Sequence, residues 1–291
     1  MSTAADTGAV IVAFHPDLDR LRSLIDTVSQ QVERVIVVDN GPGDDFELEG
    51  RAGVEIDRAG ANLGVAAALN RGIEGLRRAG VRRALLLDQD SRIEADFVGT
   101  LARELDRQRQ AGRRVAAIGA RVRDHDDRHP APFIRFRLPF NQRLDGEHGS
   151  VDCDFLITSG SLLDLDYWTD IGPMREAWFI DNIDLEWCFR ARRKGYAILG
   201  CHEAVLAHRI GERERLFGFI AYRRHAPERL YTMMRNRVFL YRSGAPRAWV
   251  VQDALRALGK LGLFALIAPR RAHLKAMLGG LRDGWTTRPL P

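Results

Sequence analysis

The chain has 291 residues, of which 45% are hydrophobic, and its formal net charge is +5. This length and composition are typical of one large α/β domain, with or without an appendage, and exclude a disordered or fibrous chain. Three cysteines, Cys153, Cys188 and Cys201, form no Cys-X-X-Cys pair and have no histidine at zinc spacing. We therefore expect no disulfides, no structural zinc and a reducing cytosol, and the first residues predict no secretory signal.

Basic residues are concentrated in the last quarter of the chain. They are Arg223, Arg224, Arg229, Arg235, Arg237, Arg242, Arg270, Arg271 and Lys275. A basic excess suits nucleic acid, an anionic membrane or an anionic small substrate. Because the motifs of known nucleic-acid-binding modules are lacking, we expect no nucleic acid as a partner and favour an anionic membrane surface.

The first part of the chain alternates between apolar runs and helical patterns. The predicted strands are 9–14, 35–38, 54–56, 84–88 and 115–119. The predicted helices begin after Pro16 and cover 65–72 and 94–111. This order predicts an α/β fold with a Rossmann-like, mostly parallel sheet flanked by helices.

The pattern is less regular after residue 120. Residues 121–149 have no clear period, which predicts a long loop or an irregular hairpin over the site. A strand is expected over 153–158, ending in a small-residue turn, and a helix over 178–195. We expect a catalytic domain over residues 1–215 and a C-terminal helical region over residues 216–291.

Two carboxylates, Asp88 and Asp90, follow the apolar run 84–87. Such a run predicts a buried parallel strand, and open α/β sheets bind ligands at the carboxyl ends of their strands. Carboxylates there suit Mg²⁺ or Mn²⁺ together with a substrate diphosphate, although an Asp-X-Asp triplet also occurs in plain loops and helix caps. His208 ends a later strand and is either a structural residue or a further ligand of this metal.

A second acidic group lies at the start of the predicted helix 178–195. Asp181 and Asp184 are three residues apart, so we expect them on one face near the N-terminal end. They suit a plain acidic helix start, which the helix dipole favours. The flanking Trp178, Ile183 and Trp187 instead favour partial burial, and partial burial turns a carboxylate into a useful base.

Residues 249–267 predict an apolar helix with a narrow polar stripe formed by Gln252, Arg256 and Lys260. Its longest uncharged stretch is far short of the ~20 residues that cross a bilayer. The helix either packs on the catalytic domain or lies in the membrane interface. In the second case we expect anionic lipid to face the four basic residues Arg270, Arg271, His273 and Lys275.

Taken in order, these pieces resemble the family 2 inverting glycosyltransferases with the GT-A fold, and within them the bacterial rhamnosyltransferases. The resemblance covers about residues 9 to 242. It rests on Ala13-Phe14-His15-Pro16, Val38-Asp39-Asn40, Asn62-Leu63-Gly64, Asn70-Arg71-Gly72, Asp88-Gln89-Asp90-Ser91, Thr158-Ser159-Gly160, the stretch from Phe179 to Trp187, His208-Arg209-Ile210-Gly211 and Arg235-Asn236.

The resemblance implies a donor site and a metal site. The residues implied in nucleotide and donor binding are Ala13, Phe14, His15, Asp39, Asn62, Gly64, Asp88 and Gln89. Asp90 would bind a Mg²⁺ or Mn²⁺ that bridges the two phosphates, and His208 would complete the coordination.

The resemblance also implies a base and an acceptor site. Asp184 would be the base, because Glu186 and Arg190 follow it at the family's spacing. Ile183 replaces the Glu that usually precedes the base, and Asp181 would supply the acceptor contact from the previous turn. The other implied acceptor residues are Trp187, Ser159 and Gly160.

The implied activity is inverting transfer of a sugar, with dTDP-rhamnose as the donor, onto a glycan or lipid-linked glycan of the cell surface. The expected location is cytoplasmic and peripheral, at the inner face of the plasma membrane. Rival functions are transfer from a UDP-sugar such as UDP-galactofuranose, and a nucleotide-sugar-binding protein without catalysis. A nucleotidyltransferase would normally show a Gly-rich basic loop after the first strand, and Phe14-His15-Pro16-Asp17 offers none.

Overall fold

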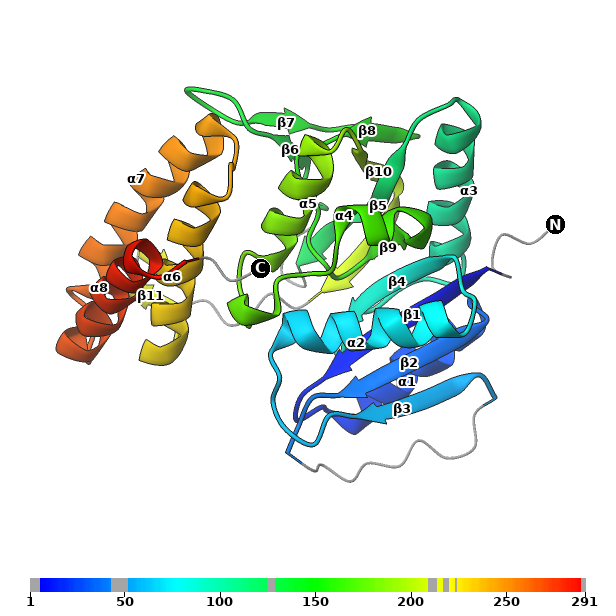
Figure 1. Cartoon of the computed structure of the whole chain (residues 1–291), viewed down its shortest axis with the longest axis horizontal. Helices are drawn as coiled ribbons and strands as arrows, with labels where there is room; N and C mark the ends of the chain where they lie inside the picture. Colours follow the sequence, from blue (N-terminus) through cyan, green and yellow to red (C-terminus); the bar gives the residue numbers. More distant parts are fainter. Residues whose placement is uncertain are drawn as a thin grey trace.

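The computed structural model describes residues 6–42, 52–124, 129–208, 214–216, 220–222 and 224–288, without the side chains of residues 208, 214–216, 220 and 221. An eight-stranded sheet runs in the order β3-β2-β1-β4-β9-β5-β10-β8 (Figure 1). The predicted fold class, a mostly parallel sheet flanked by helices, is confirmed.

The first half of the sheet is parallel. Its strands are β1 (Thr7–Ala13), β2 (Arg34–Asp39), β3 (Val54–Arg58) and β4 (Arg83–Asp88). The three central strands are apolar and buried because helices cover both faces. On one face lie α1 (Leu18–Ser29) and α3 (Phe97–Gln110), and on the other lies α2 (Val65–Arg78).

The second half of the sheet is mixed. It contains β5 (Val115–Asp124), β8 (Ser150–Asp152), β9 (Ser161–Asp164) and β10 (Ala197–His208). The strand expected over 153–158 is wrong: this stretch is irregular, and the strand β9 begins only after Gly160. Asp154 explains part of the difference, because its side chain accepts a hydrogen bond from the Phe136 backbone, while the Leu156 N–H donates to Cys188 Sγ. The apolar residues here are buried as a loop beneath a helix.

Residues 133–144 form the irregular hairpin that the sequence predicts. It pairs β6 (Phe133–Arg135) with β7 (Gln142–Leu144). Phe136 packs against Phe189, which lies in the C-terminal half of the helix formed by residues 183–193. The hairpin therefore lies at the end of that helix away from Asp184, and the expectation that it covers the site is wrong.

Three short helical turns lead to the helix that carries the second acidic group. They are η1 (Leu165–Tyr167), α4 (Trp168–Ile171) and η2 (Glu176–Trp178), and the helix itself is α5 (Ile183–Arg193). The helix expected from residue 178 therefore begins five residues later. Positive φ angles at Phe179, Asp181 and Asn182 keep these residues out of a right-handed helix.

The C-terminal region contains β11 (Glu214–Leu216), β12 (Ile220–Tyr222), α6 (Pro227–Arg242), α7 (Arg247–Phe264) and α8 (Arg270–Thr286). The three helices lie side by side at one end of the molecule (Figure 1). Phe239, Leu240 and Trp249 join the core that also contains α5 and α2, so α6 and the start of α7 are part of the main body. Among the described residues, no helix is both long and apolar enough to cross a membrane.

Candidate active site

The parallel register gathers polar residues at one edge of the sheet. Ala13 pairs with Asp39, and Val12 pairs with Asp88, so the carboxyl ends of β1, β2 and β4 lie side by side. Directly after β1, the Phe14 backbone makes two hydrogen bonds with the Gln89 side chain. The Phe14 N–H donates to Gln89 Oε1 at 2.6 Å, and Gln89 Nε2 donates to the Phe14 carbonyl at 3.2 Å. The structure thus brings together the donor residues predicted from the ends of these three strands.

Asn40 and Asn62 attach the loop before α2 to this edge. Asn40 Oδ1 accepts a hydrogen bond from the Leu63 N–H at 2.8 Å, and its amide donates to Asn62 Oδ1 at 3.3 Å. Asn62 Oδ1 also accepts from the Gly64 N–H at 3.0 Å. The predicted donor residues Asn62 and Gly64 therefore lie beside the end of β2, where the buried Asp39 accepts from the Gly41 N–H.

Gly64 is required where it stands. Its φ is +82°, and an added Cβ would lie 2.5 Å from the Phe179 ring. The next N–H, that of Val65, donates to the Phe179 carbonyl at 2.7 Å. The start of α2 is therefore in direct contact with the segment before α5, and a larger residue would separate them.

Ser159 and Gly160 lie beneath the turn that carries Asp88 and Asp90. Ser159 Oγ accepts from the Asp88 N–H at 3.2 Å and is 2.8 Å from Ser91 Oγ. The Gly160 N–H donates to the Leu86 carbonyl at 2.8 Å. Both residues, predicted as acceptor contacts, are buried and support the end of β4.

Asp90 lies on the other side of this turn. It lines a cavity of about 470 Å³ together with α1, which contributes Arg20, Ser23 and Thr27. Backbone hydrogen bonds between Arg92 and Ala207 bring the end of β10 next to this segment. His208 follows immediately, but its side chain lies outside the described residues, so its role as a ligand stays a prediction.

Asp88, which ends β4, and Asp90, which follows it, fit a divalent cation by their chemistry. Mg²⁺ and Mn²⁺ favour carboxylate oxygens, and Mg²⁺ commonly takes one or two of them and leaves the remaining positions to substrate phosphates and water. Within the described part of the chain, no group of three or more His, Cys, Asp or Glu side chains forms a metal site.

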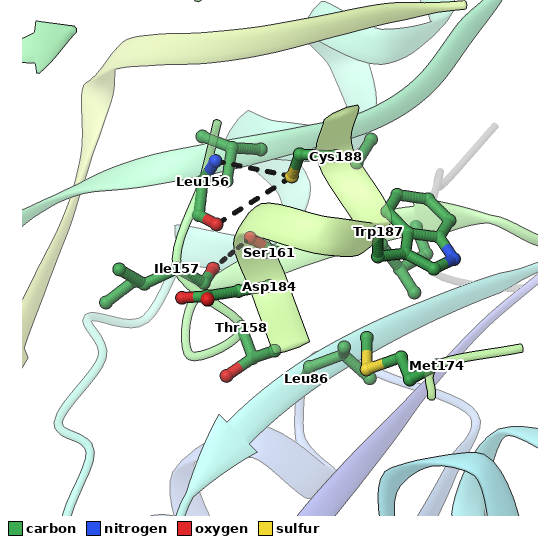
Figure 2. Close-up of a pocket in the computed structure, with 11 residues that line it drawn as sticks. Leu86, Leu156, Ile157, Thr158, Ser161, Met174, Asp184, Trp187 and Cys188 are labelled. Carbon is green, nitrogen blue, oxygen red and sulfur yellow. Dashed lines mark hydrogen bonds between the residues drawn. The ribbon is translucent and has the colours of Figure 1, made fainter. Parts of the chain in front are cut away.

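Asp184 lies in the first turn of α5, half-buried beside the edge of the sheet. It lines a small cavity of about 10 Å³, the lower limit for a single water, together with Thr158, Met174 and Trp187 (Figure 2). Burial raises its pKa from 3.8 to about 6, and the negative charges of Asp181 and Asp88 contribute to the rise. A carboxylate with this pKa is ionised at neutral pH and binds protons more strongly than an exposed one.

Asp181 lies outside the helix, contrary to the expectation that it marks the start of a shared helical face. Its φ is +65°, and its carboxylate pairs with Arg229 of α6 at 3.2 Å. It remains near Asp184, whose pKa it raises. Arg229 is therefore a neighbour of the site that sequence spacing alone did not identify.

Trp187 and Glu186 connect the first turns of α5 to the loop that precedes the helix. The Trp187 indole N–H donates to the Gly172 carbonyl at 3.1 Å, and the side chain is buried and lines the same cavity as Asp184. Buried Glu186 pairs with Arg190 at 2.8 Å, and Arg190 donates to the Ile171 carbonyl at 2.6 Å. The spacing of Glu186 and Arg190 after Asp184 therefore corresponds to a buried ion pair that holds the preceding loop.

Comparison with known proteins identifies the class. The family model for glycosyl transferase family 2 matches residues 9–163, more than half of the chain, so the chain belongs to this family. It is a glycosyltransferase. It is also 28% identical over 287 residues to the dTDP-rhamnosyl transferase RfbF of Shigella flexneri, covering 94% of this chain and 95% of that protein.

Solved structures show the same GT-A fold. S. aureus TarS 1–349 in complex with UDP-GlcNAc matches with a TM-score of 0.63 at 13% identity, over 96% of this chain and 81% of that chain. GalNAc-T7 with UDP, GalNAc and Mn²⁺ matches with a TM-score of 0.58 at 12% identity. That match covers 80% of this chain and about half, 47%, of the GalNAc-T7 chain.

The raised pKa of Asp184 predicts a pH-dependent cost in stability. The folded state holds the proton more strongly than the unfolded state does, so the contribution of Asp184 to stability is fully present below pH 4 and is lost as pH rises through 6. The difference between the ordinary pKa of 3.8 and the folded-state pKa of about 6 corresponds to a free energy of roughly 2–3 kcal/mol. Asp184→Asn should therefore raise the free energy of unfolding by up to about 2–3 kcal/mol at pH 7.5, as measured by urea denaturation.

The gain should disappear in the same measurement near pH 4, where the wild-type carboxyl is protonated. Glu147→Gln, on an exposed side chain, should change stability little at either pH and serves as the control. An Asp184→Asn protein that is less stable than wild type at pH 7.5 would contradict the conclusion that burial of the ionised Asp184 carboxylate lowers the stability of the folded state.

Proposed function

We propose that the enzyme transfers L-rhamnose from dTDP-rhamnose to a hydroxyl of a glycan or lipid-linked glycan, with inversion at the anomeric carbon. The observation that carries this proposal is a half-buried carboxylate, Asp184, whose pKa is raised by burial and by the charges of Asp181 and Asp88, the last of which ends β4. The similarity to a dTDP-rhamnosyl transferase over nearly the whole chain favours the rhamnosyl donor.

Asp184 would act as the general base. It would take the proton of the acceptor hydroxyl while the hydroxyl oxygen forms a bond to the anomeric carbon, and the bond from that carbon to the diphosphate oxygen would break with its electron pair. Attack from the face opposite the diphosphate inverts the carbon in one step. A pKa of about 6 keeps the base ionised at neutral pH and basic enough to receive a proton.

The donor would lie along the carboxyl ends of β1, β2 and β4. Asp39 and the backbone of residues 13–15 would contact the nucleoside, since these groups end neighbouring strands. Asn62 and Gly64 would form the wall beside α2. Asp88 and Gln89 would lie by the ribose and diphosphate.

A bound Mg²⁺ or Mn²⁺ would neutralise the charge that develops on the leaving diphosphate. Asp90 is the residue we propose to hold it, with His208 as a second ligand.

The acceptor would enter on the side of α5 and α6. Asp181 is the contact we favour, because it is only partly buried and lies next to Asp184. Ser159, Gly160 and Trp187 make hydrogen bonds within the chain and would shape the floor of the acceptor site.

Asp184→Asn should lower turnover by about 10² to 10⁴, the range typical of a lost general base, and leave donor affinity nearly unchanged. Asp181→Asn is the matched control and should act mainly on the apparent affinity for the acceptor. Steady-state kinetics with donor and acceptor varied separately measure both effects. A larger loss of turnover at Asp181 than at Asp184 would overturn the assignment.

The same kinetics with dTDP-rhamnose, UDP-galactofuranose and UDP-GlcNAc distinguish the donors. Faster turnover of a UDP-sugar would replace the rhamnosyl assignment. Binding of all donors without turnover of any would indicate a protein that only binds nucleotide sugars.

Asp90→Asn should weaken metal-dependent binding of dTDP at least tenfold, because it removes a negative charge from the proposed cation site. Calorimetry with and without Mn²⁺ gives the comparison, and Glu147→Gln, on an exposed side chain that does not line the Asp90 cavity, is the control. Affinity that is unchanged by a chelator and by Asp90→Asn would show that no cation is held there.

We also propose that α7 attaches the enzyme to an anionic membrane, at the inner face of the plasma membrane. Val251, Leu255 and Leu258 recur at helical spacing on α7 and are 47–65% exposed, and Leu266, just after the helix, is 52% exposed. The polar stripe predicted for this helix is divided: Lys260 is partly buried, which lowers its pKa to about 8, and Gln252 donates to the Arg137 carbonyl, whereas Arg256 is exposed. The solvent-facing surface of α7 therefore combines three apolar side chains with the exposed Arg247 and Arg256.

Charge favours lipid as the partner of this surface. Residues 216–291 contain fourteen Lys and Arg but three Asp and Glu. Arg270, Arg271 and Lys275 are exposed, directly after α7. His273 is buried against Phe264, so its predicted contact with lipid is wrong. An apolar face beside basic residues suits an anionic bilayer.

The double substitution Leu255→Glu with Leu258→Glu should reduce co-sedimentation with phosphatidylglycerol vesicles at least tenfold, because it removes apolar burial and adds repulsion. Point substitutions test this more cleanly than removal of α7, since Trp249 belongs to the main core. Leu18→Glu on α1 is the control, and salt should release the wild-type protein. Unchanged sedimentation, or a dimer that the substitutions dissociate, would refute the membrane assignment.

A further inference from the structure

Residues 178–182, which connect η2 to α5, have an unusual backbone. Phe179 has φ +65° and ψ −63°, and the Ile180 N–H donates to the Trp178 carbonyl at 2.7 Å, which together define a tight γ-turn. Asp181 and Asn182 follow in the left-handed region with φ of +65° and +63°. Each such residue costs about 1–3 kcal/mol, so neighbouring structure must hold this segment in place.

Asn236 of α6 supplies that support from one side. It is fully buried, and its amide nitrogen donates to the carbonyls of Trp178 at 2.8 Å, Ile180 at 2.7 Å and Asp181 at 3.1 Å. Three backbone carbonyls of the strained segment thus share one side-chain amide. Removal of that donor would take one hydrogen bond from each of the three carbonyls, at a cost of about 0.5–1.5 kcal/mol each, while the Trp178 carbonyl keeps the Ile180 N–H as a donor.

Arg235 orients this amide. Its guanidinium donates to Asn236 Oδ1 at 3.0 and 3.1 Å, which requires the amide oxygen to face Arg235 and the amide nitrogen to face the segment. Arg235 also donates to the Ala177 carbonyl at 3.1 Å. The two consecutive residues therefore contact the backbone from residue 177 to residue 181.

The opposite side of the segment is held by α2, through the Val65 N–H and the close approach of Gly64 to Phe179. The segment lies between a loop of the proposed donor site and a C-terminal helix. Asp184 comes two residues after it, so the direction in which α5 begins, and with it the position of the Asp184 carboxylate, depends on the same contacts.

We propose that Asn236, oriented by Arg235, is a positioning residue for the base Asp184, and that α6 is therefore a working part of the active centre. This inference rests on the proposed role of Asp184. Asn236 acts through the backbone of residues 178–182, which sets the distance of Asp184 from Asp181 and from solvent.

Asn236→Asp keeps the size of the side chain and replaces the donor with an oxygen that repels the three carbonyls. Turnover should fall about 10-fold to 100-fold, while calorimetric affinity for dTDP changes less than about twofold. The acidic limb of the turnover profile should move from about pH 6 toward 4, because water reaches a released Asp184.

Three titratable groups near Asp184 could contribute to this pH profile. They are the carboxylate of Asp181 before α5, the carboxylate of Asp88 after β4, and the thiol of Cys188 on α5. Burial raises the pKa of Cys188 to about 12, so it stays neutral throughout the range measured. Asp181 is the member of this set that moves with the segment.

Asn70 offers a matched control. It is also buried on a helix, and it binds the same stretch of chain upstream: its amide donates to the Met174 carbonyl at 2.8 Å, and its oxygen accepts from the Met174 N–H at 2.9 Å. Asn70→Asp should lower stability to a similar extent and leave the acidic limb in place. An equal shift of the limb in both variants would overturn the proposal, since it would indicate a general loosening.

A second readout does not require turnover. The ¹³C signal of the Asp184 carboxyl, assigned with Asp184→Asn, should titrate near pH 6 in the wild type and lower in Asn236→Asp. If no nucleotide sugar is turned over, the proposed function fails, and this titration still decides the positioning role. If Asn236→Asp does not fold, Arg235→Ala should shift the titration in the same direction by a smaller amount, and an unchanged titration there would overturn the proposal.

Discussion

The parallel register of β1, β2 and β4 is the constraint on which the site depends. Because the strands run in one direction and pair Ala13 with Asp39 and Val12 with Asp88, their polar ends meet at one edge. Hydrogen bonds from side chains to the backbone then connect the loops that leave this edge, as those between Gln89 and Phe14 do. The core beneath is apolar on both faces of the sheet, so the carboxylates concentrate where the strands emerge.

The site has two halves of different character. The proposed donor side is built from strand ends and their loops, which lie on the sheet. The proposed acceptor side is built from the segment before α5, where three residues have positive φ angles and hydrogen bonds from α2 and α6 hold the backbone. Strain of this kind persists only when several neighbours hold it, and it commonly occurs at functional positions.

The C-terminal helices have two roles in the structure. Toward the sheet, α6 and α7 contribute Phe239, Leu240 and Trp249 to the main core, while Asn236 reaches the segment before Asp184. Away from it, α7 exposes an apolar face. The boundary predicted at residue 215 therefore separates α6 and α7 from a core to which both helices contribute.

The sequence by itself determined the sheet, most of its strands and the positions of Asp39, Asp88 and Asp184, because apolar periodicity and the polar residues that end each run are local properties. It also indicated that Asp184 is partly buried, from the apolar residues beside it. Only the tertiary structure decided that β9 begins after Gly160, that α5 begins at Ile183, and that His273 faces inward. It alone placed Arg229 and Asn236 beside residues 178–182, about 50 positions earlier in the chain. Such contacts depend on how helices pack across the whole fold, and no local spacing in the sequence records them.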